Sequence, residues 1–285
     1  MIAQVKEDYP GMSIERLCEL MGVSRSWYYE RSTPGEKAHR DADLRDAIER
    51  IVLEFPGHGY RRVTAALRRK GWTVNHKRAL RIMRQESLLC HLKRRFVPTT
   101  DSAHAFGRYP NLIRDLEIDE LDRVWTTDIT YIRLPTTFCY LAAILDAYSR
   151  KCVGWHLSRW IDTRLTLLAL EMALVSRRPD PGLIHHSDQG VQYASSEYVL
   201  RLEEAGAQIS MAAVGNPYEN AQAESFFRTL KLEEVYIKDY RDFEEAEQNI
   251  AEFIEEVYNK KRLHSSLGYL PPVEFEALHA LKAGS

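Results

Sequence analysis

The sequence predicts an α/β protein in which a core built on a mixed sheet follows small all-α units. Apolar residues recur at helical spacing as far as residue 86, whereas short strand-like segments bounded by turn residues begin at Val124. The charge divides at nearly the same place, because residues 1–117 carry 22 Lys and Arg against 15 Asp and Glu, and residues 118–285 carry 17 against 26. A length of 285 residues suffices for about two domains.

The composition is typical of a water-soluble globular protein, with 45% hydrophobic and 28% charged residues. The longest apolar run, 138–145, has eight residues and is far shorter than the ~20 residues of a membrane helix. Residues 1–11 lack the apolar centre of a signal peptide. We therefore expect a cytoplasmic protein without a membrane partner. Four scattered cysteines exclude a CxxC zinc knuckle and argue against a disulfide framework: Cys18, Cys90, Cys139 and Cys152.

Residues 1–34 contain a helix-turn-helix pattern. Ser13 can cap a first helix, Gly22 interrupts it, and Ser24 can cap a second. The apolar positions of the first helix are Ile14, Leu17, Cys18 and Met21. The second helix begins with Arg25, Ser26, Trp27 and Tyr28. This arrangement is typical of DNA-binding helix-turn-helix motifs, and it fits a plain helical hairpin equally well.

Residues 35–97 form a second helical unit. After a turn or linker at 32–35, apolar residues at helical spacing predict a helix over 41–55. Two shorter helices are expected at 60–70 and 75–86, separated by a turn that contains glycine.

This second unit is the most basic part of the chain. Residues 58–97 contain twelve Lys and Arg but only one acid, Glu86. A solvated helix face normally mixes both signs, so the excess predicts a DNA-binding module that contacts the phosphate backbone. The predicted contact residues are Arg61, Arg62, Arg68, Arg69, Lys77, Arg78, Arg81 and Arg84.

Residues 98–117 are expected to link this module to the core, because they contain Pro, Gly and small polar residues without clear periodicity. The core, 118–240, opens with three strands close enough in sequence to form an antiparallel meander, at 126–133, 140–145 and 152–157. The mixed five-stranded sheet is completed by a helix, a strand, a helix, a strand and a helix at 163–176, 183–186, 195–204, 208–211 and 220–235. Residues 241–285 contain a polar helix, 243–258, and a tail.

Three carboxylates stand where structure alone would not place them. Asp128 lies inside a strand, although Asp is rare in strands and costly to bury without a partner. Asp188 directly follows a strand, where α/β sheets present ligand-binding groups, and Glu224 lies in the first turns of a helix. If they converge, they form an oxygen-only site suited to Mg²⁺ or Mn²⁺ rather than zinc. Two such ions can assist an in-line phosphoryl transfer.

Each carboxylate also has a structural explanation when it is taken singly. Asp188 could cap a helix, Glu224 could complement a helix dipole, and Asp128 could pair with Arg133. The joint pattern therefore carries the prediction.

Three other residues near these carboxylates are expected to be structural. Asp146 ends a strand and should shape a turn with Ser149 and Arg150. His185 and His186 flank Asp188, but no third soft ligand stands at useful spacing, so we expect them to support the site rather than to react.

Several ordered motifs span nearly the whole chain. They are TTDSAH (99–104), WTTDITYI (125–132), YLAAILDAYSRKCVGW (140–155), HSDQGVQYAS (186–195), GNPYENAQAESFFRTLK (215–231) and YNKKRLHSSLGYLPP (258–272). Through these motifs the chain resembles the DDE transposases of the retroviral integrase superfamily, specifically the second-frame (OrfB) proteins of the bacterial insertion-sequence-three family.

The resemblance implies a ribonuclease-H-like integrase catalytic core in which Asp128, Asp188 and Glu224 bind Mg²⁺ or Mn²⁺, with two ions and no zinc. It implies a transposase that cleaves double-stranded DNA at the ends of an insertion element and transfers the strands to a target. Lys231, seven residues after Glu224 and two helical turns along the same face, would contact DNA. The implied partners are a second copy of the chain during synapsis and an upstream-frame (OrfA) protein or fusion.

Two other functions stay open. The core could act only as a metal-dependent nuclease, or the chain could be a DNA-binding regulator with a silent integrase-like core; the intact carboxylates argue against the regulator. Apart from Lys231 and residues 260–262, the acidic half offers few groups to hold DNA, so the basic module should supply most of the affinity. Charge reversal is predicted to weaken DNA binding at Arg61, Arg62, Lys77 and Arg78.

Overall fold

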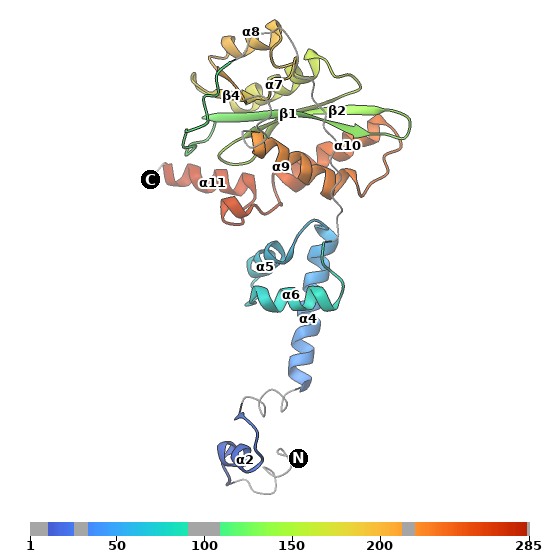
Figure 1. Cartoon of the computed structure of the whole chain (residues 1–285), viewed down its shortest axis with the longest axis vertical. Helices are drawn as coiled ribbons and strands as arrows, with labels where there is room; N and C mark the ends of the chain where they lie inside the picture. Colours follow the sequence, from blue (N-terminus) through green and yellow to red (C-terminus); the bar gives the residue numbers. More distant parts are fainter. Residues whose placement is uncertain (1–10, 26–33, 91–108, 213–219, 284–285) are drawn as a thin grey trace. The chain divides into compact units, whose positions relative to one another are not determined.

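The computed structural model describes residues 11–25, 34–90, 109–212 and 220–283. The chain divides into two compact units, Met1–Cys90 and His91–Ser285 (Figure 1). Each unit has its own hydrophobic core. No helix among the described residues is long and apolar enough to cross a membrane.

The first helix of the N-terminal pattern is confirmed as α2, Ile14–Leu20. Ser13 caps it, because the Ser13 hydroxyl accepts a hydrogen bond from the Arg16 backbone N–H (3.2 Å). Gly22 follows with a φ of +64°, a conformation that glycine adopts without strain, and the helix ends before it. The expected second helix falls almost entirely on residues 26–33, which lie outside the described residues.

Helix α4, Pro34–Glu54, begins seven residues earlier than predicted. The expected turn or linker at 32–35 is therefore wrong for Pro34 and Gly35, which form the first turn of the helix. Proline is well suited to the first helical position, since the backbone N–H that it lacks would have no partner there and its φ is already helical.

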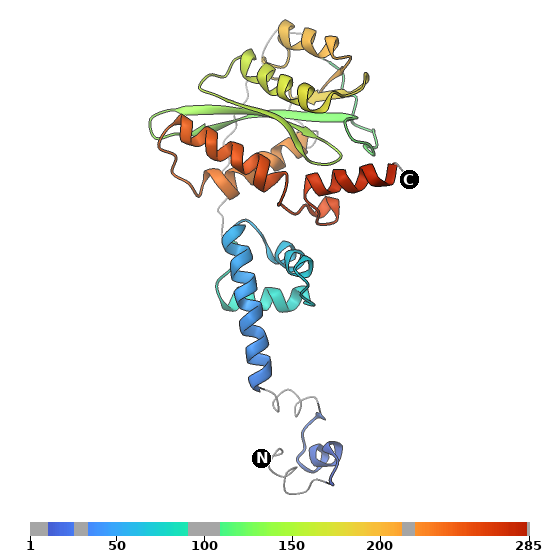
Figure 2. The ribbon, with the colours of Figure 1, turned by 180° about the vertical axis from the view of Figure 1, so that it is seen from behind.

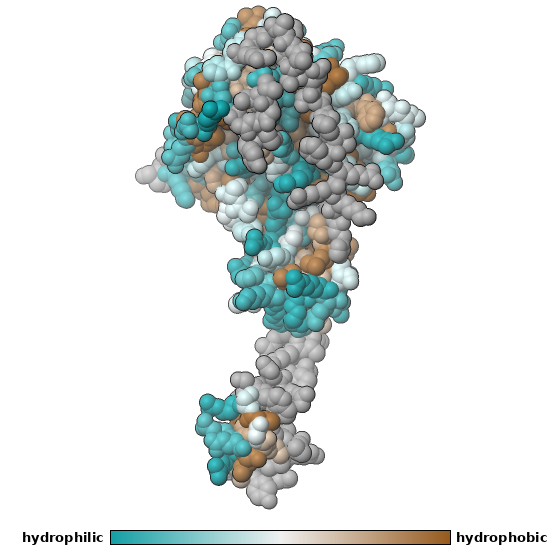
Figure 3. Space-filling view, viewed as in Figure 1, coloured by the Kyte–Doolittle hydropathy of each residue, from teal (hydrophilic) through white to brown (hydrophobic). Residues whose placement is uncertain are grey.

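Helices α5, Tyr60–Arg69, and α6, His76–Gln85, occur where they were predicted. Asn75 caps α6 by accepting a hydrogen bond from the Lys77 backbone N–H (2.9 Å). Hydrophilic residues cover much of the visible face of the unit formed by α4 to α6 (Figure 3). Its core combines residues of all three helices and the intervening turn: Leu44, Ile48, Ile51, Val63, Leu67, Val74, Ala79, Ile82 and Met83.

The C-terminal unit contains a five-stranded sheet in the order β3-β2-β1-β4-β5. Its strands are β1 Val124–Arg133, β2 Phe138–Asp146, β3 Cys152–Ser158, β4 Ile184–Ser187 and β5 Gln208–Met211. The first three strands form the predicted antiparallel meander, and β4 and β5 are parallel to β1, so the mixed sheet is confirmed. On β1, only Val124–Thr126 pair with β4, so the remainder of β1 has β2 as its single neighbouring strand and leaves an open edge.

Helices cover both faces of this sheet (Figures 1 and 2). Helices α7, Thr163–Arg177, and α8, Ser196–Glu204, lie on one face, and α9, Ala221–Leu230, and α10, Phe243–Glu252, lie on the other. Helix α7 packs very closely on β3, because a Cβ atom at Gly154 would lie 2.3 Å from the Ala169 carbonyl oxygen. The glycine in this strand therefore sets the distance between helix and sheet.

Two helices continue into π-helical turns. Helix α9 runs into η2, Lys231–Val235, and α10 runs into η3, Phe253–Tyr258. A short 3₁₀ turn, η4, follows at Ser265–Leu267.

The tail of the chain is a helix that the sequence did not predict: α11, Pro272–Ala283. Glu276 anchors it, because its carboxylate accepts hydrogen bonds from the Ser149 hydroxyl (2.8 Å), the Lys151 amine (2.9 Å) and the Arg177 guanidinium (2.9 Å). These interactions join residues more than 90 positions apart, so local sequence could not reveal them.

The end of the predicted linker contacts the sheet. The Leu112 backbone N–H donates to the Ser210 hydroxyl (2.9 Å), and the Met211 N–H donates to the Pro110 carbonyl (3.4 Å). Residues 109–112 are thus held against β5.

Candidate active site

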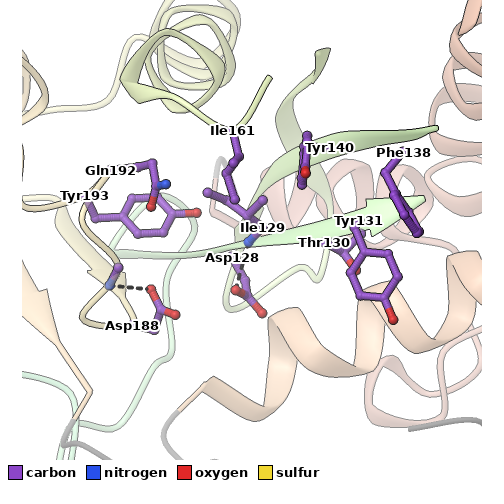
Figure 4. A pocket seen from close by; sticks show the side chains of 11 residues that line it. Asp128, Ile129, Thr130, Tyr131, Phe138, Tyr140, Ile161, Asp188, Gln192 and Tyr193 are labelled. Atoms are coloured by element: carbon purple, nitrogen blue, oxygen red, sulfur yellow. Dashed lines mark hydrogen bonds between the residues drawn. The ribbon is translucent and has the colours of Figure 1, made fainter. Parts of the chain in front are cut away.

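Two of the three predicted carboxylates lie together at the open edge of β1. Asp128 stands on β1 just beyond the part that pairs with β4, and Asp188 directly follows β4. Because β1 and β4 are parallel, residues that follow their pairing emerge at the same edge of the sheet. Both carboxylates line a pocket of about 330 Å³ and point toward the same side of it (Figure 4).

Backbone N–H groups fix the orientation of both carboxylates. The Ile129 N–H donates to Asp128 Oδ1 (2.8 Å), and the Gly190 N–H donates to Asp188 Oδ1 (2.9 Å). A Cβ atom at Gly190 would lie 2.9 Å from the same Asp188 oxygen, so a larger residue there would displace the carboxylate or the loop. The glycine of the HSDQG motif therefore has a specific structural purpose.

The two carboxylates repel each other in a poorly solvated place. Burial, followed by the charge of Asp188, raises the pKa of Asp128 to about 8, and the charge of Glu224 acts in the same direction. A neighbouring cation would stabilise the ionised form of such a carboxyl group. Hard carboxylate oxygens are the ligands that Mg²⁺ and Mn²⁺ prefer, so this donor set fits a divalent metal.

Glu224 does not line the pocket. It is exposed in the first turn of α9, although it lies near enough to Asp128 for its charge to affect the pKa of that group. Partial desolvation raises the pKa of Glu224 itself, and Arg228 opposes this shift. Within residues 11–25, 34–90, 109–212 and 220–283, no three His, Cys, Asp or Glu side chains are close enough to hold a metal ion. The structure thus brings Asp128 and Asp188 together in the pocket, and Glu224 lies outside the pocket lining but near Asp128.

Lys231 lies near Asp128. Its amine stands 4.6 Å from the centre of the Tyr131 ring, a distance at which a cation is attracted to the ring face. Burial lowers the pKa of Lys231, and the charge of Asp128 counteracts that effect.

The two histidines lie beneath the site rather than in it. His185 is buried, and its Nε2 lies 3.0 Å from the Tyr198 hydroxyl. Burial lowers the pKa of His185 to about 3, so its ring is neutral at physiological pH. His186 is also buried, and its Nδ1 lies 2.8 Å from the Ser210 hydroxyl. Neither ring lines the pocket, in agreement with the predicted supporting role.

Asp146 shapes a turn as predicted. Its carboxylate accepts hydrogen bonds from the backbone N–H groups of Ser149 (2.6 Å), Tyr148 (3.1 Å) and Asp122 (2.7 Å). The Arg150 backbone N–H also donates to the Asp146 carbonyl (2.9 Å).

Two residues that tie the site together were missed from the sequence. The Asn220 amide donates to the Thr127 carbonyl (3.1 Å) and so joins the start of α9 to β1, next to Asp128. The Tyr193 hydroxyl lies 3.1 Å from the Thr127 hydroxyl and braces the loop after Asp188 against β1. Both residues lie within the motifs noted above, but their roles depend on contacts with a strand at least 66 positions away.

Part of the predicted DNA-contact set is engaged within the basic module. Arg78 and Arg81 both bind the Asp41 carboxylate (2.6 and 2.8 Å), and together they hold the pKa of Asp41 below its usual range. Arg68 donates to the Val74 carbonyl (3.2 Å) and thereby supports the turn between α5 and α6. Three other members of the predicted set are exposed: Arg61, Lys77 and Arg84.

Only part of the 260–262 cluster is exposed and able to meet DNA, as the sequence suggested. Arg262 is buried and makes two hydrogen bonds to the Glu233 carboxylate (2.9 and 3.0 Å). Lys260 pairs with Glu256 (2.6 Å) on the surface, and Lys261 is exposed.

Three protein-family models match the chain. One integrase core domain model matches residues 119–217, which include Asp128 and Asp188, and a second matches residues 205–272, which include Glu224. An HTH-like domain family matches residues 38–96, the basic module, rather than the N-terminal pattern at 11–25. The mixed five-stranded sheet with helices on both faces is accordingly a ribonuclease-H-like, integrase-type core, preceded by an HTH-like domain.

Similar proteins come from insertion elements. The chain is 36% identical over 277 residues to the insertion element IS600 uncharacterized 31 kDa protein of Shigella sonnei, covering 94% of this chain and all of that protein. It is 32% identical over 270 residues to the transposase InsF for insertion sequence IS3A of Escherichia coli, covering 93% and 94%. The HTLV-2 integrase catalytic core domain, solved in complex with magnesium, aligns with 54% of this chain and 95% of its own at 13% identity, with a TM-score of 0.44. The chain belongs to the insertion-sequence transposases of the IS3 family.

Proposed function

We propose that this protein is a DDE transposase that cleaves double-stranded DNA at the ends of its insertion element and joins the released strands to target DNA. The observation that carries the proposal is the pair of Asp128 and Asp188 in one pocket, in a family whose members include named transposases. The acidic residues at this edge give the fold a site for phosphoryl transfer rather than only for DNA binding.

Asp128, Asp188 and Glu224 would hold Mg²⁺ or Mn²⁺, with two ions at the site. When bound, such ions activate the attacking oxygen and stabilise the leaving oxygen of an in-line phosphoryl transfer. The exposed Glu224 would complete the ligand set from the first turn of α9. Its neighbour Asn220 already ties that turn to β1.

The chain's own groups orient the reactants. The N–H groups of Ile129 and Gly190 hold the two aspartates in fixed orientations, so little motion is needed when DNA binds. Lys231 places a positive charge beside the carboxylates, where it would contact a DNA phosphate. In the first step water attacks the phosphodiester at the element end and releases a 3′-hydroxyl. In the second step that hydroxyl attacks a target phosphodiester, so one bond forms as another breaks.

The other parts of the chain would deliver DNA to this core. The proposed division is 1–34 and 35–97 for DNA binding, 98–117 as a linker, 118–240 as the catalytic core, and 241–285 as a C-terminal helix and tail. The proposed partners are the element's terminal repeats and target DNA, a second copy of the chain in the DNA complex, and an upstream-frame protein or fusion.

Cleavage and strand transfer on labelled duplexes that carry the element's end sequence test this proposal. The wild-type protein should form joined products with Mg²⁺ or Mn²⁺, and Glu224→Gln should abolish them, because this near-isosteric change removes one ligand charge. Glu197→Gln is the matched control, since Glu197 is likewise exposed in the first turn of a helix, α8. It should leave the products unchanged.

Other outcomes separate the alternatives. Cleaved but never joined products would indicate a nuclease. Metal-independent binding with no cleavage, by this chain or by a fusion to the upstream frame, would support the regulator. Full activity of Glu224→Gln would remove Glu224 from the ligand set.

A further inference from the structure

The pocket at the candidate site extends well beyond the two carboxylates. Asp128 and Asp188 occupy one end with Tyr193 and Gln192, whereas Tyr131 and Phe138 lie at the other end, with Tyr140 and Ile161 along the side (Figure 4). An aromatic end of this kind is not needed to hold a metal ion, so it is open to another part of the substrate.

The aromatic end is accessible and preorganised. Phe138 and Ile161 are both 44% exposed, although large apolar side chains normally leave water when a core is available. The Tyr131 ring is held between two neighbours, since the Phe138 ring meets it edge-on at 5.7 Å and the Lys231 amine lies 4.6 Å from its centre. Trp160, adjacent to Ile161 in the chain, is 73% exposed. Aromatic side chains gathered in this way offer flat apolar surfaces for stacking.

The charges of the pocket indicate what its aromatic end can bind. In the described part of the chain the pocket lining contains two aspartates and no Lys or Arg, so the lining itself offers no positive charge to an anionic group. A flat, neutral group with polar edges fits better, because Thr130 and Gln192 offer hydrogen-bonding groups within an otherwise apolar lining. Lys231 stands against Tyr131, where it would hold the phosphate attached to such a group.

We infer that this pocket binds an unpaired nucleobase of the DNA, from a nucleotide next to the phosphodiester that reacts at Asp128 and Asp188. The inference rests on the proposed function. The base is the neutral planar part of a nucleotide, and it can reach an aromatic pocket only after it has left the duplex stack. The pocket thus recognises a locally opened DNA end and places the adjacent phosphodiester beside the carboxylates.

A double-mutant cycle between protein and DNA tests the pocket. Phe138→Ala and Ile161→Ala would be combined in the full-length chain, with Leu200→Ala as a control because Leu200 is 55% exposed on α8 and does not line the pocket. Binding without added metal and cleavage with Mg²⁺ would be measured on element-end duplexes. One set would be intact, and the others would carry an abasic site at one of the positions that flank the cleaved bond.

The pocket variant should bind and cleave intact DNA roughly 5- to 100-fold less well than the wild type, the range expected for loss of one aromatic stack. At one abasic position this difference should disappear, because the base that fills the pocket is absent. Phe138→Tyr should retain binding, and Leu200→Ala should behave as the wild type on every duplex.

An equal penalty on the intact and all abasic duplexes, or no penalty at all, would overturn the inference. Such a result is distinct from failure of the proposed function, which would appear as absence of cleavage by the wild-type protein. In that case the binding measurements still decide whether the pocket holds a base.

Discussion

The HTH-like module and the integrase-type core use arginine–carboxylate pairs in opposite ways. In the module, Asp41 binds two arginines, and the three side chains are 33%, 38% and 49% exposed. In the core, the side chains of Arg262 and Glu233 are 5% and 6% exposed. Water and ions can compete for the first pair but not for the second. The module's ion pairs are therefore open to competition from other charged groups, whereas the core pair is part of the structure.

Removal of one member of the buried pair should have a large effect on stability. Arg262→Met leaves the Glu233 carboxylate buried without its partner, which should lower the free energy of unfolding by about 3–5 kcal/mol. Urea unfolding would measure this change. Arg78→Met is the matched variant from the exposed pair, and it should lower the free energy of unfolding by less than about 1 kcal/mol.

A second variant tests the cause. Glu233→Leu combined with Arg262→Met removes both charges, and it should recover most of the stability, because apolar pairs of similar volume often replace buried ion pairs well. Similar losses for Arg262→Met and Arg78→Met would contradict the contrast between the two regions.

Two buried amides of the core differ in their position relative to the site. Asn220 joins α9 to the carbonyl of Thr127, beside Asp128. Asn259 clamps the backbone of Cys152 through two hydrogen bonds of 3.0 Å, on the outer strand β3. Asn220→Ala should reduce cleavage about 10- to 100-fold and raise the Mg²⁺ concentration needed for half-maximal activity, because the carboxylates lose their alignment.

Asn259→Ala is the control for a purely structural amide. It should lower the free energy of unfolding by about 1–3 kcal/mol but leave the Mg²⁺ dependence of the folded protein unchanged. If both variants shift the Mg²⁺ dependence equally, Asn220 has no special role in positioning the site.

The sequence predicted what local patterns encode. The three-strand meander, α5, α6 and the turn at Asp146 follow from periodicity and turn chemistry, and the structure contains them. Asp128 could be singled out because a carboxylate inside an apolar strand is unusual. Its partnership with Asp188 follows from the parallel pairing of β1 and β4, which the sequence did not specify.

Long-range contacts were beyond the same reasoning. The start of α4 at Pro34 was missed because Pro and Gly next to each other usually indicate a turn. Helix α11 was missed because its main anchor, Glu276, forms hydrogen bonds with residues of the turn before β3 and of α7, which are distant in the sequence. Arg262 looked like a DNA contact because its burial against Glu233, 29 positions away, leaves no trace in a charge count.

A buried group that stays neutral gives a smaller, pH-dependent effect. Burial lowers the pKa of His185 to about 3, whereas the unfolded chain has a histidine of ordinary pKa, near 6.5. Below pH ~6.5 the unfolded state therefore binds a proton that the folded state does not, so the free energy of unfolding falls by up to about 1.4 kcal/mol per pH unit toward pH 3. Above pH ~6.5 this contribution is constant.

His185→Gln removes this linkage. At pH 7.5 the variant should be less stable than the wild type, because its contact with Tyr198 is altered. Urea unfolding at pH 7.5 and 5.5 should show that the difference narrows by about 1.4 kcal/mol at the lower pH. Parallel stability curves for the two proteins would show that His185 is not the group responsible.

Exposed cations of the HTH-like module and of the core should contribute differently to DNA binding. Loss of a single charge should change the affinity for DNA by less than tenfold. Lys77 lies exposed at the start of α6, and Lys261 lies exposed on the core. If the HTH-like module supplies the phosphate contacts, Lys77→Gln should weaken binding and reduce the slope of log affinity against log salt by about 0.9, the value for one lost contact with duplex DNA. Lys261→Gln should leave the slope unchanged.

Binding isotherms at several salt concentrations distinguish these cases, because a general loss of positive charge would affect both variants alike. Arg84→Gln should repeat the effect of Lys77→Gln, since it is also exposed on α6. Arg78→Gln should have a smaller effect on the slope, because that arginine already neutralises Asp41. A slope that falls with Lys261→Gln and not with Lys77→Gln would place the phosphate contacts on the core, despite its excess of acidic residues.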